Sequence, residues 1–229
     1  MKTAVFGTDV VGQTIAAKLI SLGHEVTIGT RDVAKTLSRK EKDRYGNLGF
    51  GDWYEANKGR LNIGTFADAA GRSEMIFNCT MGLASLDVMK EAGKQNIKGK
   101  ILVDVANPLD FSRGMPPILN PVNTDSLGEL LQRMFPDVYV VKTLNTMNCY
   151  LMVDPASVHG DHNVFMSGND QHAKDRVRDL LMSFGWRENN IIDLGDITTA
   201  RGTEQLLPIW VRLYGKFGNA NFNFHIVRG

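Results

Sequence analysis

Two kinds of hydrophobic pattern alternate along this chain of 229 residues. Short apolar runs are typical of buried strands, whereas apolar residues that recur every three or four positions are typical of helices packed on one side. The runs predict strands at residues 3–6, 25–29, 61–66, 75–79, 100–105 and 138–142. The recurring pattern predicts helices at residues 13–22, 67–72, 83–92 and 127–134. Between residues 32 and 58 the chain is mostly polar, and we expect only a loop at 46–51 and a helical turn at 52–57. Strands that alternate with helices in this way predict an α/β fold with a doubly wound, mostly parallel sheet.

The last third of the chain continues this alternation on a smaller scale. Strands are predicted at residues 163–167 and 191–194, with a helix at 171–184 between them. A long helix is then predicted at residues 199–217, and it is apolar on more than one face. Such a helix is either buried in the core, which is the commoner case, or covered by a partner subunit or an active-site cleft. We therefore expect a larger domain at residues 1–150 and a smaller C-terminal α/β lobe at 151–229.

A glycine-rich turn, Gly7-Thr8-Asp9-Val10-Val11-Gly12, joins the first predicted strand to the first helix. With the second strand, these elements form the βαβ unit that binds dinucleotides. Gly7 permits a tight turn, Gly12 lets the helix pack closely on the sheet, and free N–H groups at the helix start suit a pyrophosphate. Asp9 replaces the middle glycine of the usual G-x-G-x-x-G pattern. Facing the pyrophosphate at about 4 Å, its charge would cost roughly 1 kcal/mol in water and about 4 kcal/mol at an effective dielectric near ~20. We favour a side chain turned to solvent, for which this cost is much smaller.

The end of the second strand indicates which dinucleotide is bound. A site for NAD usually has Asp or Glu here to bind the ribose 2′-OH, whereas a site for NADP has small hydroxyl residues and Arg. This strand ends in Thr30 and Arg31, with Lys35 one helical turn further on. A hydroxyl and two cations suit a 2′-phosphate. Asp32 leaves an alternative open, because a shift of one residue would point its carboxylate at the ribose.

Three further strands end in groups that could line a nicotinamide. Ligands of doubly wound sheets bind outside the carboxyl ends of the strands. These ends carry Cys79-Thr80-Met81, Ala106-Asn107-Pro108 and Leu144-Asn145-Thr146. Asn-Pro and Asn-Thr are also ordinary turn formers, so each end has a purely structural explanation as well. Their common position at one edge of the sheet is what favours a site.

Composition narrows the classes of function. The 26 Lys and Arg residues against 25 Asp and Glu give a formal net charge of +1, which indicates neither nucleic acid nor a membrane surface as partner. The first strand begins too early to leave room for a signal peptide, and no apolar run approaches the length of a membrane span, so we expect a cytoplasmic protein. Cys79 and Cys149 lie in apolar stretches without metal-ligand spacing, which predicts reduced core thiols. The five histidines form no motif, so we assign no catalytic histidine and no metal site.

From its first 32 residues onward, the chain resembles the NADP oxidoreductases that depend on the deazaflavin coenzyme F420. The likeness rests on the glycine turn with Thr30, Arg31 and Lys35, and on later segments in the same order along nearly the whole chain. Those segments are Asn107-Pro108-Leu109, Ser112-Arg113-Gly114, residues 140–146, and Arg201 with residues 206–213. The resemblance implies a Rossmann domain that binds NADP(H), a small C-terminal lobe and homo-oligomers. It also implies direct hydride transfer between the nicotinamide and a flavin-like ring, which needs two aligned rings and no general base.

The resemblance also implies which residues of this sequence contact the cofactor, because they occupy the positions of the family's contact residues. The resemblance implies that the pyrophosphate is held by Gly7, Thr8, Val10, Val11 and Gly12, beside Asp9 where the family usually has glycine. It implies that the 2′-phosphate is held by Thr30, Arg31 and Lys35. It implies that the nicotinamide is flanked by Thr80, Met81, Asn107 and Asn145. The acceptor is expected to be a small redox molecule of the flavin or deazaflavin type, and a quinone is a further option.

Two other functions remain open at this point. A hydroxyacid dehydrogenase is suggested by Lys216 and Asn219, since a Lys-x-x-Asn pair on a buried helix could protonate a carbonyl. Only ten residues follow Asn219, which leaves no helical domain of the size that such enzymes use. A non-catalytic NADP-binding module or redox sensor is favoured by Asp9 and predicts binding without turnover.

Overall fold

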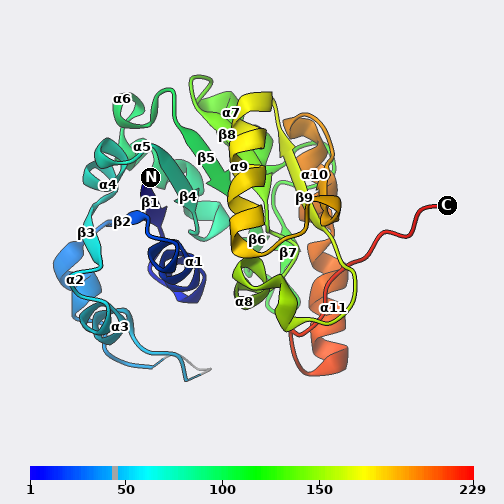
Figure 1. Ribbon diagram of the computed structural model, residues 1–229, viewed down its shortest axis with the longest axis horizontal. Helices are drawn as coiled ribbons and strands as arrows, with labels where there is room; N and C mark the ends of the chain where they lie inside the picture. Colours follow the sequence, from blue (N-terminus) through cyan, green and yellow to red (C-terminus); the bar gives the residue numbers. More distant parts are fainter. Residues whose placement is uncertain (43–45) are drawn as a thin grey trace.

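The fold is centred on one twisted sheet, and the computed structural model describes residues 1–42 and 46–229. Over these residues the sheet has eight strands in the order β10-β9-β8-β5-β4-β1-β2-β3 (Figure 1). The strands are β1 Lys2–Phe6, β2 Glu25–Thr30, β3 Leu61–Thr65, β4 Met75–Asn78, β5 Ile101–Asp104, β8 Tyr139–Thr143, β9 Val164–Gly168 and β10 Ile191–Asp193. Within this described sheet only the pairing of β8 with β9 is antiparallel. The predicted doubly wound, mostly parallel sheet is confirmed.

Helices cover both faces of the sheet, so its strands are buried on both sides. The α-helices are α1 Val10–Ser21, α2 Val33–Leu37, α3 Phe50–Ala56, α4 Phe66–Arg72, α5 Ser85–Ala92, α6 Lys94–Ile97, α7 Leu127–Met134, α8 Cys149–Val153, α9 Gln171–Phe184, α10 Ala200–Gln205 and α11 Leu207–Phe217. Short 3₁₀ helices lie at η1 Gly82–Ala84, η2 Pro155–Ser157, η3 Glu188–Asn190 and η4 Ile197–Thr199. A separate hairpin pairs β6 Leu109–Asp110 with β7 Ile118–Leu119.

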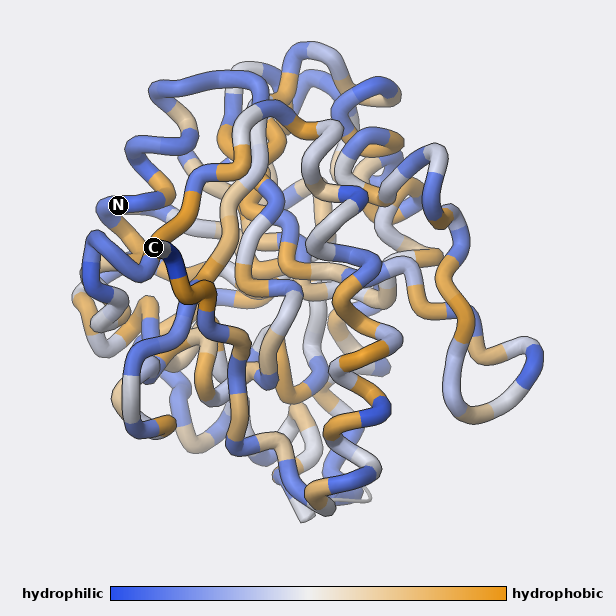
Figure 2. The backbone as a smooth tube through the Cα atoms, turned by 90° about the vertical axis from the view of Figure 1, so that its right-hand side faces the viewer, coloured by the Kyte–Doolittle hydropathy of each residue, from blue (hydrophilic) through white to orange (hydrophobic). Residues whose placement is uncertain are grey.

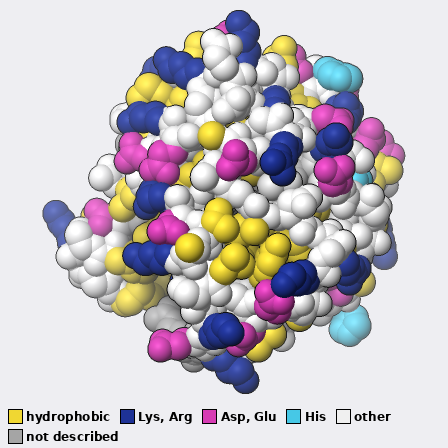
Figure 3. All heavy atoms as spheres, turned by 90° about the vertical axis from the view of Figure 1, so that its left-hand side faces the viewer, with side chains coloured by type: hydrophobic (Ala, Val, Ile, Leu, Met, Phe, Trp, Pro, Cys, Tyr) yellow, Lys and Arg dark blue, Asp and Glu magenta, His cyan; other side chains and the backbone are white. Residues whose placement is uncertain are grey.

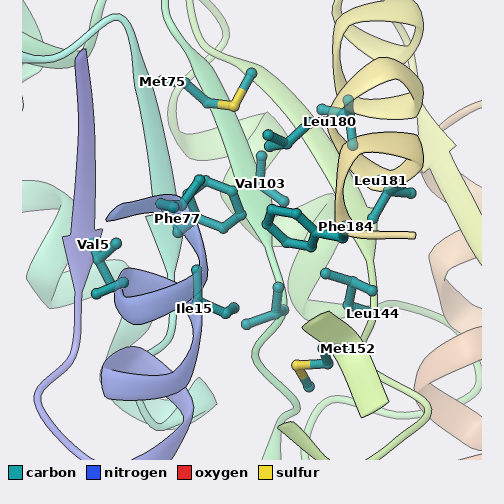
Figure 4. Close-up of a cluster of buried hydrophobic side chains, with 14 of the residues drawn as sticks. Val5, Ile15, Met75, Phe77, Val103, Leu144, Met152, Leu180, Leu181 and Phe184 are labelled. Atoms are coloured by element: carbon teal, nitrogen blue, oxygen red, sulfur yellow. The ribbon is translucent and has the colours of Figure 1, made fainter. Parts of the chain in front are cut away.

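Side chains of successive strand residues enter two different hydrophobic clusters, one on each face of the sheet. Val5 belongs to the same cluster as Ile15 of α1 and Phe184 of α9, on one face of the sheet (Figure 4). Its neighbour Phe6 packs on the other face, where its ring meets that of Phe66 edge to face at 5.1 Å. This alternation is the period of two expected of a strand. Burial on both faces explains why the central strands are continuous apolar runs rather than alternating ones.

Several predicted boundaries differ from the structure. α1 begins at Val10 rather than at residue 13, because the two valines of the glycine turn belong to the first helical turn. The short helices α2 and α8 and the two-residue strands of the hairpin were not predicted, since elements of this length leave little periodicity. The boundary between a larger domain and a C-terminal lobe stays a prediction. β9 and β10, which fall in that lobe, hydrogen-bond onto the same sheet.

The predicted long helix at residues 199–217 is two helices, and its second half is not a core helix. The break falls at Leu206, and Pro208, which has no N–H to donate, stands in the first turn of α11. Within α11 only Leu207 is buried, while Ile209 is 47% exposed and Phe217 is 53% exposed. Figure 2 views the molecule from the side that carries α11 and the C-terminal residues. The expectation that this helix is buried in the core is therefore wrong for α11. Apolar periodicity indicates which side chains favour burial, but it does not show which segment buries them.

None of the described helices is long and apolar enough to cross a membrane.

Candidate cofactor site

The glycine turn lies at the point where the winding of the sheet reverses. β1 is flanked by β2 on one side and β4 on the other, so the ends of β1 and β4 diverge toward helices on opposite faces. Gly7 has a φ of 121°, and a Cβ there would overlap the carbonyl oxygen of Cys79 at the end of β4. A Cβ on Gly12 would overlap the carbonyl oxygen of Gly7. Both positions therefore require glycine, and the backbone between them forms the turn, here called the glycine cradle, that leads into α1.

Asp9 is turned away from this cradle. It is the N-cap residue of α1, but its side chain makes no capping hydrogen bond and is 87% exposed. Its carboxylate pairs with Arg39, with Asp9 Oδ1 at 3.3 Å from Arg39 Nη1. The amide of Gln13 donates to the carbonyl oxygen of Thr8 at 3.0 Å and closes the turn from the helix side. Sequence analysis did not single out Arg39, which lies thirty residues away in the polar stretch.

At the end of β2 the predicted phosphate-binding residues lie in different environments. The hydroxyls of Thr30 and Thr36 bond at 2.7 Å in a buried pair. Arg31 is exposed and donates from Nε to Glu91 of α5 at 3.1 Å. The Asp32 carboxylate accepts the Lys35 backbone N–H at 2.9 Å and so caps α2. Figure 3, which views this edge of the molecule, shows basic and acidic side chains interspersed rather than a surface of one sign.

The ends of β4 and β5 are joined by a buried polar chain. Asn78, the last residue of β4, donates to Asp104 Oδ1 at 2.8 Å and to the Ser85 hydroxyl at 2.9 Å. Its own Oδ1 accepts the Thr80 hydroxyl at 2.6 Å. Asn78 thus holds Thr80 in place, while the Met81 side chain beside it is 60% exposed.

The loops after β5 and β8 are tied together by two amides. Asn107 Nδ2 donates to the carbonyl oxygen of Asn145 at 2.8 Å, and Asn145 Nδ2 donates back to Asn107 Oδ1 at 2.9 Å. Gly82 closes on the same loop, because a Cβ there would overlap the carbonyl oxygen of Asn107. The predicted nicotinamide residues on β4, β5 and β8 are therefore brought to one edge of the sheet and linked to one another.

Beneath these loops lies a buried ion cluster that sequence analysis missed. Lys142 Nζ lies 2.9 Å from Asp104 Oδ2 and 2.8 Å from Glu204 Oε1, and it donates to the carbonyl oxygen of Ala106 at 2.5 Å. Glu204 in turn accepts the backbone N–H groups of Leu127 at 2.9 Å and Gly128 at 3.1 Å. Burial alone would lower the pKa of Lys142, but the two carboxylates outweigh it and the pKa is raised. The sequence does contain one indication of this cluster, because Lys142 is a charged residue at the end of an otherwise apolar predicted strand.

Neither Cys79 nor Cys149 is in a disulfide; Cys149 is buried and Cys79 is half-buried. Burial raises the pKa of Cys79, and the negative charge of Asp104 raises it further. Burial also raises the pKa of Cys149, whose sulfur accepts a hydrogen bond from the Thr14 hydroxyl. Neither thiol is therefore an activated nucleophile near neutral pH. Among the described residues, no group of three or more His, Cys, Asp or Glu side chains could hold a metal ion.

Comparisons with known proteins agree with this geometry. Residues 2–108 match the family model of coenzyme F420-dependent NADP oxidoreductases. A crystal structure of a proposed F420-dependent NADP-reductase from Arthrobacter sp. FB24 is 56% identical, with all of each chain covered and a TM-score of 0.94. The chain belongs to the F420-dependent NADP oxidoreductase family. The family resemblance drawn from the sequence is confirmed, and with it an NADP-dependent oxidoreductase on an NAD(P)-binding Rossmann fold.

More distant family relatives differ in overall length. The F420-dependent NADP reductase of Methanothermobacter marburgensis is 27% identical over 218 residues, which cover 93% of this chain and 92% of that protein. The metalloreductase STEAP3 of Rattus norvegicus is 26% identical over 215 residues. Those residues are 91% of this chain but only 38% of the metalloreductase, so the chain spans about two fifths of that relative's length.

Proposed function

We propose that this oxidoreductase transfers a hydride between the nicotinamide of NADP(H) and a flavin-like or deazaflavin acceptor. The observation that carries the choice of NADP is the environment of Asp32. Its carboxylate caps α2 by accepting the Lys35 N–H, and the exposed cation Arg31 stands beside it. A capped carboxylate is a poor partner for a ribose 2′-OH, whereas Arg31 and Lys35 suit a 2′-phosphate.

Three groups of residues are assigned to three parts of the cofactor: the pyrophosphate, the 2′-phosphate and the nicotinamide. The glycine cradle presents the backbone N–H groups at the start of α1 to the pyrophosphate, at Gly7, Thr8, Asp9, Val10, Val11 and Gly12. The 2′-phosphate contacts are assigned to Thr30, Arg31 and Lys35. The nicotinamide contacts are assigned to Thr80, Met81, Asn107 and Asn145. NADP(H) supplies the hydride, and the chain contributes a fixed position for the nicotinamide ring.

The polar links under the nicotinamide end support this division. The reciprocal amides of Asn107 and Asn145 fix two loops against each other, and Asn78 fixes Thr80. Groups held in this way lose little freedom when a ring docks on them, which favours a reproducible distance for hydride transfer. The proposed reaction uses no side chain as a general base.

A fluorescence titration with NADPH and NADH side by side tests the proposed cofactor. We expect NADPH to bind roughly tenfold or more tightly, since a charge-assisted phosphate contact contributes about 1.5 to 3 kcal/mol. Stopped-flow oxidation of bound NADPH by FMN, by a 5-deazaflavin and by a quinone then identifies the acceptor class. Because one relative is a metalloreductase, a ferric chelate with and without flavin completes the panel. Preference for NADH would overturn the assignment of NADP.

The same panel separates an enzyme from a sensor. Tight binding of NADPH without turnover of any acceptor would instead support a non-catalytic NADP-binding module. The family resemblance also leads us to propose a homo-oligomer that works in the cytoplasm, and light scattering of the purified protein measures its mass in solution. A monomer at micromolar concentration would contradict that part of the proposal.

A further inference from the structure

The guanidinium of Arg39 lies on the glycine turn. Its Nη1 is 3.3 Å from Asp9 Oδ1, and its Nη2 donates to the carbonyl oxygen of Thr8 at 3.4 Å and to the Thr8 hydroxyl. One side chain from the segment after α2 thus contacts both residues that follow Gly7. These contacts bring a permanent positive charge to the place where the family pattern has only backbone.

The backbone around Arg39 is held in place by the start of α3. The carbonyl oxygen of Arg39 accepts the N–H of Gly51 at 2.8 Å. Gly51 and Gly49 both pack against this segment so closely that a Cβ on Gly51 would overlap the Leu37 carbonyl, and one on Gly49 would lie 2.7 Å from the Arg39 carbonyl. The backbone position of Arg39 is therefore fixed by the fold of the polar stretch, and its side chain, 43% exposed, reaches the turn from there.

A small cavity of about 200 Å³ opens between this segment and the turn. Thr8, Asp9 and Arg39 line one part of it, and Asn47, Leu48 and Gly49 line another, with the carboxylate residue Glu41 also in the lining. The Asp9 carboxylate is 87% exposed, so water screens its repulsion of a pyrophosphate at this turn, and Asp9 alone would lower affinity only about severalfold. The guanidinium offsets that charge, and its planar fork matches the geometry of phosphate oxygens.

We infer that Arg39 is a pyrophosphate-binding residue, which offsets Asp9 and pairs with the cofactor. The inference rests on the proposed function, because it concerns the same nucleotide. It places Arg39 at the pyrophosphate, which NADPH and NADH share, and not at the 2′-phosphate. It also makes Asp9 and Arg39 a coupled pair, since each charge changes the effect of the other.

A double-mutant cycle tests the inference with NADPH and NADH as the fluorescent probes. Arg39→Gln should weaken the binding of both nucleotides by the same factor, roughly tenfold, and the loss should grow smaller as salt is raised. Adding Asp9→Gly to Arg39→Gln should recover part of the lost affinity. Arg187→Gln is the matched control, because it removes an exposed arginine from a similar ion pair with Asp161 at 3.1 Å. That control should leave both dissociation constants unchanged.

Each other outcome overturns a defined part of the inference. Unchanged or tighter binding in Arg39→Gln would show that Arg39 does not bind the cofactor. A change in the NADPH to NADH ratio would move Arg39 to the 2′-phosphate, and no recovery with Asp9→Gly would remove Asp9 as its counter-charge. Equal denaturation midpoints of wild type and variants ensure that folding is not the cause. If the wild type binds neither nucleotide, the proposed function fails together with this inference, whereas wild-type binding with an indifferent Arg39→Gln overturns this inference alone.

Discussion

Two regions at the carboxyl edge of the sheet differ in how their polar side chains are placed. Those near β4, β5 and β8 are buried, whereas those at the end of β2 are exposed. Under the loops of β4, β5 and β8, Asn78, Asp104, Lys142 and Glu204 are buried and bonded to one another. At the end of β2, Arg31 is 65% exposed and forms a surface ion pair with Glu91. Buried polar groups are costly when left unpaired, whereas exposed pairs are screened by water and contribute little.

From this difference we infer that the buried end contributes to the stability of the fold and that the exposed end determines the choice of nucleotide. At the buried end, the polar groups fix the relative positions of three strand ends, so a change there is felt by the whole fold. At the exposed end, charges can be exchanged without disturbing the core, so the choice of nucleotide can change while the fold stays intact. Three perturbations, taken from the largest expected effect to the smallest, test whether the two ends are separable in this way.

Removing the central cation should break the buried end. Lys142→Met leaves Asp104 and Glu204 facing each other without a counter-charge, and loss of one member of a buried ion cluster costs about 3 to 5 kcal/mol of unfolding free energy. Urea denaturation followed by circular dichroism measures this loss. Lys90→Met is the control, because Lys90 is in an exposed ion pair with Asp87. A Lys142→Met midpoint equal to that of the control would show that the cluster does not hold the strand ends together.

Arg31→Ala should change cofactor choice without changing stability. Loss of one exposed cation from the 2′-phosphate should weaken NADPH binding roughly tenfold and leave NADH binding unaltered. Parallel titrations with both nucleotides measure the ratio. Glu91→Gln is the matched variant, since it frees Arg31 from its partner and should maintain or increase NADPH affinity. An equal loss of NADPH and NADH affinity in Arg31→Ala would place Arg31 away from the 2′-phosphate.

Alkaline pH should reduce the stability contributed by the buried ion cluster by less than the Lys142→Met substitution does. The pKa of Lys142 is raised in the folded protein, where burial opposes the charge but Asp104 and Glu204 favour it more strongly. The folded state therefore holds this proton more tightly than the unfolded state. The contribution is complete below the ordinary lysine pKa of 10.5 and declines above it.

Between pH 8 and pH 11, the difference in unfolding free energy between wild type and Lys142→Met should shrink by about 1 kcal/mol. Denaturation curves of both proteins at the two pH values measure this change, and comparing them cancels the titration of the other lysines. A constant difference would mean that folding leaves the pKa of Lys142 unchanged, and a change of opposite sign would mean that Lys142 is neutral in the folded protein.

The sequence predicted local structure well wherever one pattern determines it. β1 and β2 were found within one residue, because an apolar run bordered by glycines leaves few alternatives. The carboxyl-end residues could also be placed on one edge, because parallel strands bring those ends together. These parts of the candidate site follow from neighbours in the chain.

Contacts between distant segments were beyond the sequence patterns. Lys142 meets Asp104 across 38 residues and Arg39 meets Thr8 across 31, and no period links such positions. α11 shows the same limit, since its apolar residues were visible but their exposure was not. Local hydrophobic periodicity shows whether a side chain is suited to burial. Which residue it contacts depends on the arrangement of the whole chain.

Gly82 is a further position at which evolution has little choice. Gly7 and Gly12 belong to a recognised motif, but Gly82 lies outside any motif and faces the Asn107 carbonyl just as closely. Gly202 and Gly215, by contrast, have open space where a Cβ would lie. Over long divergence, substitutions should accumulate at the last two positions and be purged at Gly82, although nothing in the letters around it marks the difference. What selection would preserve there is the absence of a side chain, because the Asn107 carbonyl already fills the space that a methyl group would need.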